Sequence, residues 1–281
     1  MKSFIKVIIA GAVILVLGIG VLAVALGING WQIDGDYEMK TFECQDTNTT
    51  LDIDFAAGTL EINKYDGQFI KIEYPENSIW STDVTESNGT VSVATTGKFR
   101  WNNIPSLFMK IPTTKIWIPQ GDILNIKLDM DAGTVKFAEG EYGDFIVAMN
   151  AGTFLTQDIV CKKLSVEMNA GTISIKDVVS EQNVNIDLNA GAINVQSLVC
   201  PALKSEVSAG SVNINKLQTS YVDVDVNAGS LKLGMTGAKS DYNIDVDKSA
   251  GSCNISNQNG STDKRIKAEV SAGSLVVKFD A

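Results

Sequence analysis

One short motif recurs through most of this chain and limits the folds that it can adopt. In the motif, Ala-Gly is preceded by Asn, Ser, Asp or Ala and followed by Thr, Ser or Ala. It occurs nine times, with its glycines at Gly58, Gly133, Gly152, Gly171, Gly191, Gly210, Gly229, Gly251 and Gly273. The first two glycines are far apart, whereas the later ones follow one another at a nearly constant spacing of about twenty positions. A regular period of this size indicates an array of stacked repeats.

Apolar residues alternate with polar residues on both sides of the motif. Before Gly152 the apolar residues are Phe145, Val147 and Met149, and after Gly171 they are Ile173 and Ile175. A period of two predicts strands, so each repeat is a strand, a glycine corner, a second strand and a turn. A unit of this length cannot close a core alone, but stacked units can pair strand on strand. The sequence therefore predicts an all-β fold, a parallel β-solenoid with coils of about 20 residues.

Stacking turns each position of the repeat into a column that runs along the solenoid. Asn150, Asn169 and Asn189 precede successive corners and are expected to form a hydrogen-bonded ladder. The glycines are expected where a Cβ atom would obstruct the corner. Because the last two coils are longer, regularity should decrease towards the C-terminal end.

The N-terminal region has a different character. Val7 to Ile28 carries no charge and is long enough to span a bilayer as a helix. Lys2 and Lys6 precede the run, which predicts a cytoplasmic N-terminus, an uncleaved single-pass anchor in the cell membrane and an extracytoplasmic C-terminal domain. The alternative is a signal peptide cleaved near Ala23-Val24-Ala25. The expected organisation is a cytoplasmic stub and anchor over 1–30, a first coil with an irregular cap over 31–125, and regular repeats over 126–281.

The irregular part between the first two corners is rich in aromatic residues. Strands are expected at Phe69–Tyr74, Thr90–Ala94 and Lys115–Ile118. One interpretation is a cap that protects the first coil against aggregation. The other is a ligand-binding surface that presents Trp101 and Phe108 to a glycan, a protein or a membrane.

The repeats of this chain resemble those of a known group of proteins. The repeats D-M-D-A-G-T-V-K-F and N-A-G-T-I-S-I, with the extended segment I-W-I-P before them, are similar to the bacterial putative-adhesin β-solenoid family, which is related to head GIN domains. The resemblance covers roughly residues 40 to 281. It implies a β-solenoid architecture and an adhesin-like role, and it brings no catalytic residues to carry over.

Composition excludes several classes of activity. The chain has no histidine, so it cannot use an imidazole base or a histidine-ligated metal. Its formal charge of −10 makes nucleic acid an unfavourable partner. Cys161 and Cys200 are expected about 9.6 Å apart, two coils from each other, which is too far for a disulfide. We therefore expect four free thiols, with Cys253 in the core and Cys44 before the first coil.

Acidic residues form the most distinctive predicted column. Four residues before the corner glycine, eight of the nine repeats have Asp or Glu. The continuous part of the column contains Glu167, Asp187, Glu206, Asp225, Asp247 and Glu269. Adjacent like charges on neighbouring strands are destabilising. The column is either a solvated face or a weak site for calcium or cationic peptides. No other cofactor is expected.

Three functions are compatible with these features. The first is a membrane-anchored, surface-exposed adhesin-like or ligand-binding module that is not an enzyme and that binds a cell-surface glycan or protein. The second is a structural or envelope-stress accessory that acts through a partner membrane protein. The third, a polysaccharide-processing enzyme, is disfavoured because coils this short leave little length for loops that could build a cleft.

Overall fold

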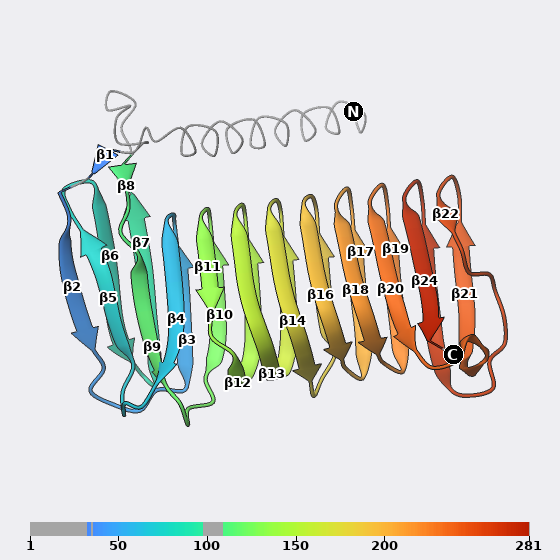
Figure 1. Cartoon of the computed structure of the whole chain (residues 1–281), viewed down its shortest axis with the longest axis horizontal. Coiled ribbons are helices and arrows are strands. Elements are labelled where there is room, and N and C mark those ends of the chain that lie inside the picture. The colour runs from blue at the N-terminus through green and yellow to red at the C-terminus, as the bar shows by residue number, and fades with distance from the viewer. Residues whose placement is uncertain (1–32, 35, 98–108, 281) are drawn as a thin grey trace.

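The computed structural model describes residues 33–34, 36–97 and 109–280. This part of the chain is a long stack of β-coils, shown with its long axis horizontal in Figure 1. Within it, the one helix is a three-residue 3-10 turn, Lys239–Asp241. The N-terminal strands are β1 (Ile33–Asp34), β2 (Glu38–Glu43), β3 (Thr50–Phe55), β4 (Thr59–Tyr65), β5 (Lys71–Glu76), β6 (Trp80–Ser87), β7 (Thr90–Gly97), β8 (Met109–Lys110) and β9 (Thr114–Pro119).

The remaining strands carry the regular repeats. They are β10 (Asn125–Met130), β11 (Thr134–Phe137), β12 (Gly140–Met149), β13 (Thr153–Met168), β14 (Thr172–Ser180), β15 (Val184–Leu188), β16 (Ala192–Val199), β17 (Ala202–Val207), β18 (Ser211–Gln218), β19 (Tyr221–Val226), β20 (Ser230–Thr236), β21 (Tyr242–Lys248), β22 (Ser252–Cys253), β23 (Lys264–Val270) and β24 (Ser274–Asp280). β13 is long because it runs from one coil into the next.

Two sheets result from this stacking, and their strands are parallel except at the N-terminal end. The pre-corner sheet contains the strands before each corner, in the order β6, β7, β3, β10, β12, β13, β15, β17, β19, β23 and β21. The post-corner sheet contains the strands after each corner, in the order β2, β5, β9, β4, β11, β13, β14, β16, β18, β20, β24 and β22. The prediction of a parallel β-solenoid with one short coil per repeat is confirmed.

The core lies between the two sheets and is built from the alternating apolar residues. Phe145 is in register with Leu164, which is in register with Val184, and all three are buried. Each coil thus adds a layer of aliphatic and aromatic side chains to one continuous core. Burial of apolar surface, at roughly 25 cal/mol per Å², is the main source of stability in such a stack.

The corner requires glycine because successive coils approach closely there. Gly171 has a φ of +121°, and a Cβ atom on it would lie 2.2 Å from the carbonyl oxygen of Gly152. Beside it, the amide of Thr172 donates a hydrogen bond to that same carbonyl at 2.8 Å. A side chain would therefore strain the backbone and also overlap the neighbouring coil.

The asparagine ladder forms as predicted. Asn169 donates to Asn150 at 2.8 Å, and Asn189 donates to Asn169 at 2.7 Å. Asn150 in turn donates to the carboxylate of Asp131 at 2.8 Å, so an acid ends the ladder. These bonds fix the register on the outside of the corner, whereas the apolar columns fix it inside.

The order of the coils departs from the order of the sequence at both ends. β23 and β24 lie between the β19–β20 coil and the β21–β22 coil, which Figure 1 shows as red β24 to the left of orange β21. Near the N-terminal end, β3 and β4 lie between β7–β9 and β10–β11. At each end, the outermost parallel coil thus does not occupy its sequential place.

The long interval between Gly58 and Gly133 contains an additional coil that the motif does not reveal. β7 and β9 occupy the two sheets beside β3 and β4, with Leu51 in register with Val91 and Ile62 with Ile116. The expected strands Phe69–Tyr74, Thr90–Ala94 and Lys115–Ile118 are confirmed as β5, β7 and β9, with boundaries shifted by a few residues. β2, β5 and β6 pair antiparallel at this end of the stack.

The far end is less regular, as expected from its longer intervals. β22 has two residues, and Asn254 continues its pairing through the side chain, which bonds both the amide and the carbonyl of Val277. Gln258 forms an antiparallel bridge with Ile244 of β21. The edge of the last pre-corner strand is therefore partly covered by a loop.

The predicted fold class needs one correction, which concerns the N-terminal transmembrane helix. Val7 to Ile28 lies outside the described residues. In the ranges 33–34, 36–97 and 109–280, no helix is long and apolar enough to cross a bilayer. The described residues accordingly form an all-β solenoid, and they contain no helix that corresponds to the predicted anchor. The predicted single-pass membrane localisation, with a cytoplasmic N-terminus and an extracytoplasmic domain, depended on that helix and is therefore not supported by the described residues.

Candidate functional site

The acidic column is formed by the parallel register of the pre-corner sheet. Its continuous part runs in the spatial order Glu167, Asp187, Glu206, Asp225, Glu269 and Asp247. Neighbouring strands are about 4.8 Å apart, so six carboxylates follow one another at that spacing. Glu269 precedes Asp247 in this order, although it follows it in the sequence, because β23 lies between β19 and β21. Five of the six are exposed, including Asp247 at the end of the column, whereas Asp225 is partly covered.

The same column continues towards the N-terminal end of the stack. Asp54 is in register with Asp129, and Ala148 separates Asp129 from Glu167. Partial burial raises the pKa of Asp54, and the negative charges of Asp129 and nearby acids raise it further. The repulsion expected within an acidic column thus has a visible effect at this position.

The neighbouring outward column, six residues before each glycine, supplies compensating lysines. Lys127 lies 3.2 Å from Asp52. Lys267 stands in register between Asp223 and Asp245, which the sequence order would have placed side by side. Its Nζ atom lies 3.7 Å from Asp223 and 3.1 Å from Glu269. The exchange of coils therefore interposes a cation among acids that would otherwise repel one another.

A shallow groove follows the middle of the acidic column. It has a volume of about 270 Å³ and is lined by Ser165, Val166, Glu167, Asn185, Ile186, Asp187, Lys204 and Glu206. Three carboxylates and one ammonium group leave it with a net negative charge. Such a surface attracts cations and basic peptide segments by long-range electrostatics.

The acidic column does not provide a ready metal cage. In the part of the chain that the structure describes, no group of three or more acidic, cysteine or histidine side chains converges closely enough to hold a metal ion. The side chains stand in a line, whereas calcium is usually surrounded by six to eight oxygen ligands. Weak calcium binding at Glu167, Asp187, Glu206, Asp225, Asp247 and Glu269 remains a prediction, as does binding of cationic peptides.

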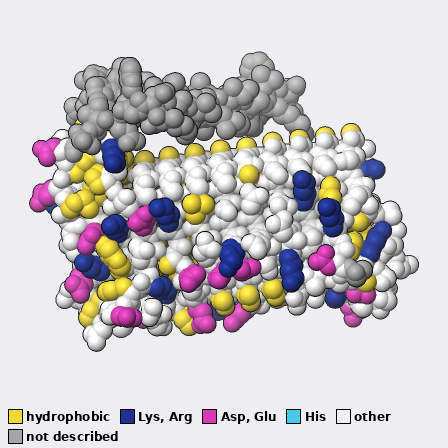
Figure 2. All heavy atoms as spheres, in the orientation of Figure 1, with side chains coloured by type: hydrophobic (Ala, Val, Ile, Leu, Met, Phe, Trp, Pro, Cys, Tyr) yellow, Lys and Arg dark blue, Asp and Glu magenta, His cyan; other side chains and the backbone are white. Residues whose placement is uncertain are grey.

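The other predicted binding residues, Trp101 and Phe108, lie outside the described residues. Their role as a ligand-binding surface stays a prediction. Elsewhere on the molecule, Figure 2 shows charged side chains of both signs scattered over the visible face. The exposed apolar residues include Val160 and Val179, which are neighbours in register on β13 and β14.

All four cysteines are free, which confirms the prediction from their spacing. Ser180 is in register with Cys161 on the adjacent strand. Burial raises the pKa of the Cys161 thiol to about 11, and burial likewise raises the pKa of Cys200 to about 11. These thiols are protonated at neutral pH and act as small core residues rather than nucleophiles or metal ligands.

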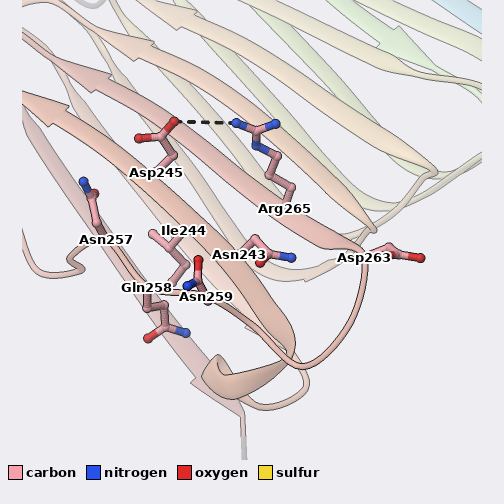
Figure 3. Close-up of a pocket in the computed structure, with 8 residues that line it drawn as sticks. All are labelled: Asn243, Ile244, Asp245, Asn257, Gln258, Asn259, Asp263 and Arg265. Atoms are coloured by element: carbon pink, nitrogen blue, oxygen red, sulfur yellow. Dashed lines mark ion pairs between the residues drawn. The ribbon is translucent and has the colours of Figure 1, made fainter.

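The sequence reasoning missed a polar pocket at the C-terminal end of the stack, shown in Figure 3. Its volume is about 720 Å³, and it is lined by Asn243, Ile244, Asp245, Asn257, Gln258, Asn259, Asp263 and Arg265. β21 and β23 supply one wall, and the loop between β22 and β23 supplies the other. One sequence feature could have indicated this pocket: the interval before Gly273 is lengthened and contains the amide-rich segment N-I-S-N-Q-N-G.

Three solved structures are similar to this chain over nearly their whole length. A putative adhesin from Bacteroides fragilis has a TM-score of 0.55 and 14% identity, covering 87% of this chain and 99% of its own. A putative adhesin from Parabacteroides distasonis has a TM-score of 0.56 and 9% identity, with coverages of 88% and 99%. A third, from Parabacteroides merdae, has a TM-score of 0.53 and 10% identity, with coverages of 89% and 99%. At these identities the similarity shows the fold alone.

No curated protein matches the chain by sequence. A family match is nevertheless clear, and it spans the first coil, the additional coil between the first two corners, the acidic column and the polar pocket. Across residues 48–281, the chain belongs to the Toastrack DUF4097 family.

Proposed function

We propose that this chain is a non-catalytic binding module of the adhesin type, which holds a glycan or protein of a cell surface against its outward columns. The observation that carries the proposal is the unbroken register of the pre-corner sheet, because it repeats one chemical group at a fixed spacing along the molecule. The names of the similar structures support the same role.

The geometry favours binding over catalysis. The acidic side chains stand on a largely exposed face, and the groove beside them is small, about 270 Å³. Catalytic carboxylates generally need different environments that separate their pKa values, whereas repeated positions on one face have similar surroundings. A row of like groups instead provides many weak contacts, whose combined strength exceeds that of each contact.

The acidic column is the face that we assign to basic partners. Calcium or a cationic peptide segment would reduce the repulsion between neighbouring carboxylates, so binding would stabilise the solenoid at the same time. This link between binding and stability gives the proposal a second, independent readout.

The test is an adhesion assay with the purified full chain immobilised on a surface. Bacterial and epithelial cells are passed over it, and retention is compared with that of the triple variant Asp187→Asn, Glu206→Gln and Asp225→Asn. The matched control is Asp158→Asn, Asp177→Asn and Glu181→Gln, which removes the same charge away from the column. We expect retention by the wild type and the control, and a loss in the column variant.

Two results would contradict the proposal. If the wild type retains no cells and captures no cell-surface protein or glycan, the binding role is wrong. If both triple variants lose retention equally, net charge rather than the column is responsible.

A further inference from the structure

The polar pocket at the C-terminal end has features of a ligand-binding site, and its role is not explained by the acidic column. Figure 3 shows Asp245 and Arg265 pointing towards each other from neighbouring strands, while Asn257, Gln258 and Asn259 come from the loop beside β21. Of the eight lining residues, only Ile244 is apolar. A purely apolar ligand would therefore leave most of these polar side chains without a partner.

The pocket walls are held in place by hydrogen bonds from the lining residues themselves. Asn257 accepts a bond from the amide of Val246 at 2.6 Å. Gln258 donates through its side chain to the carbonyl of Lys239 at 2.7 Å, and Asn243 donates to that of Thr262 at 2.7 Å. Because these bonds order the loop in advance, a ligand would bind without a large entropic cost of ordering it.

The same side chains retain groups that can bind a ligand. An amide has two donor hydrogens and one acceptor oxygen, so Asn257 keeps its NH₂ group and Gln258 keeps its carbonyl oxygen. Asp245 and Arg265, 3.6 Å apart and largely exposed, add acceptors and donors. The lining thus offers both donors and acceptors, as is needed to bind adjacent hydroxyl groups, each of which both donates and accepts.

Charge and edge geometry exclude other ligand classes. Asp245 and Asp263 outweigh Arg265, so the pocket carries one net negative charge and disfavours phosphate or carboxylate ligands. A peptide adding as a strand to β21 would need free backbone amides. Those of Ile244 and Val246 are already bonded, to Gln258 and Asn257.

We propose that this pocket binds a neutral oligosaccharide end through its hydroxyl groups. The inference rests on the proposed binding function and deepens it, since it names a ligand class and a pocket at the end of the stack, away from the column residues Asp187, Glu206 and Asp225 that the adhesion assay changes. Asn243, Asn257 and Gln258 make the bonds that fix the loop. Lining residues that make none of these bonds can therefore be changed to test ligand binding.

The experiment applies the purified full chain to an array of neutral and sialylated oligosaccharides. The test variant combines Asp245→Ala with Asn259→Ala, since neither residue provides the loop-fixing bonds described above. A second variant, Asn259→Trp, fills the pocket instead of emptying it. The control combines Glu181→Ala with Asn183→Ala, an acid and an amide on a turn in the middle of the stack. Melting temperatures confirm that each variant is folded.

We expect neutral oligosaccharides to bind the wild type, about tenfold weaker binding or more for both pocket variants, and binding within about twofold of wild type for the control. Three results would each overturn the inference: the wild type prefers sialylated oligosaccharides, the pocket variants bind neutral oligosaccharides as tightly as the wild type, or the wild type binds none. Retention of cells in the adhesion assay would still support the proposed function in those cases, so the two failures can be distinguished.

Discussion

Lys267 and Asp223 are neighbours in register on adjacent strands, although they lie far apart in the sequence. The contact exists because β23 lies between β19 and β21, and Asp245 flanks Lys267 on the other side. The hydrogen bond to Glu269 is the main reason that the pKa of Lys267 is raised, and the negative charges of Asp223 and Glu269 raise it further. The displaced coil thus places a positive charge among several acids.

The first prediction concerns this cation. Lys267→Glu would place three acids side by side at Asp223, position 267 and Asp245, so the melting temperature should fall. Lys216→Glu, on the post-corner sheet, is the control with the same charge change and should have a smaller effect. The difference should shrink at high salt, because the charges are exposed. Equal melting temperatures for the two variants at low salt would argue against the contact.

The second prediction concerns the corner. Gly171→Val should destabilise the protein more than Val178→Ala, because its Cβ atom would meet the Gly152 carbonyl oxygen at 2.2 Å. Backbone strain alone costs about 1 to 3 kcal/mol, and the overlap adds to it. Val178 is buried, so its truncation leaves a small cavity in the core. Denaturant unfolding compares the two, and a Gly171→Val variant as stable as wild type would refute the tight corner.

The third prediction tests cation binding by the acidic column. Calcium should raise the melting temperature of the full chain more than sodium does at matched ionic strength, since a bound divalent ion reduces repulsion between adjacent carboxylates. The double variant Asp187→Asn and Glu206→Gln should lose this additional effect. An equal response to the two salts, or a calcium effect that persists in the variant, would identify the column as a solvated face only.

The fourth prediction follows from the raised pKa of Asp54. A carboxyl whose pKa is higher in the folded than in the unfolded protein favours the folded state when protonated, so its contribution to stability falls as pH rises through that range. Asp54→Asn should therefore melt at the same temperature as wild type or slightly higher at pH 7. This advantage should disappear below about pH 4, near the ordinary carboxyl pKa. A variant that is less stable than wild type only at pH 7 would contradict the sign.

The fifth prediction concerns thiol reactivity. Cys44, Cys161 and Cys200 are buried, and burial raises the pKa of each thiol. Cys253 is partly exposed. A thiol reagent at pH 8 should therefore modify about one cysteine quickly in the native protein and all four after denaturation, because the thiolate is the reactive form. Rapid modification of all four in the native protein would show that the core is not closed.

The sequence was sufficient to predict the period, the corner and the register, because these depend on local features. The alternation around Gly152 and the asparagines at 150, 169 and 189 each specify one position in the coil. The additional coil of β7 and β9 could not be recognised, since the segment joining these strands lacks the Ala-Gly motif. Strands at Thr90–Ala94 and Lys115–Ile118 were nevertheless expected.

The order of the coils could not be predicted in the same way. Each coil offers nearly the same apolar columns, so any coil can pair with any other on that basis alone. The observed order is distinguished by particular contacts, such as Lys267 between Asp223 and Asp245 and the loop that covers β21. The polar pocket results from that loop, and its residues are remote from any repeated motif. A local pattern therefore could not locate it.

The position of β23 and β24 also affects the order in which the molecule can be assembled. The coil of β21 and β22 is synthesised before the coil on which it packs. Until residues 264–280 have followed, β21 lacks the strand that pairs with it in the finished protein, and the β19–β20 coil lacks its outer neighbour. A ribosome-bound chain ending before β23 can add the β19–β20 coil to the coil before it, but its β21–β22 coil has no strand to pair with, so the last two coils join the stack together rather than one at a time.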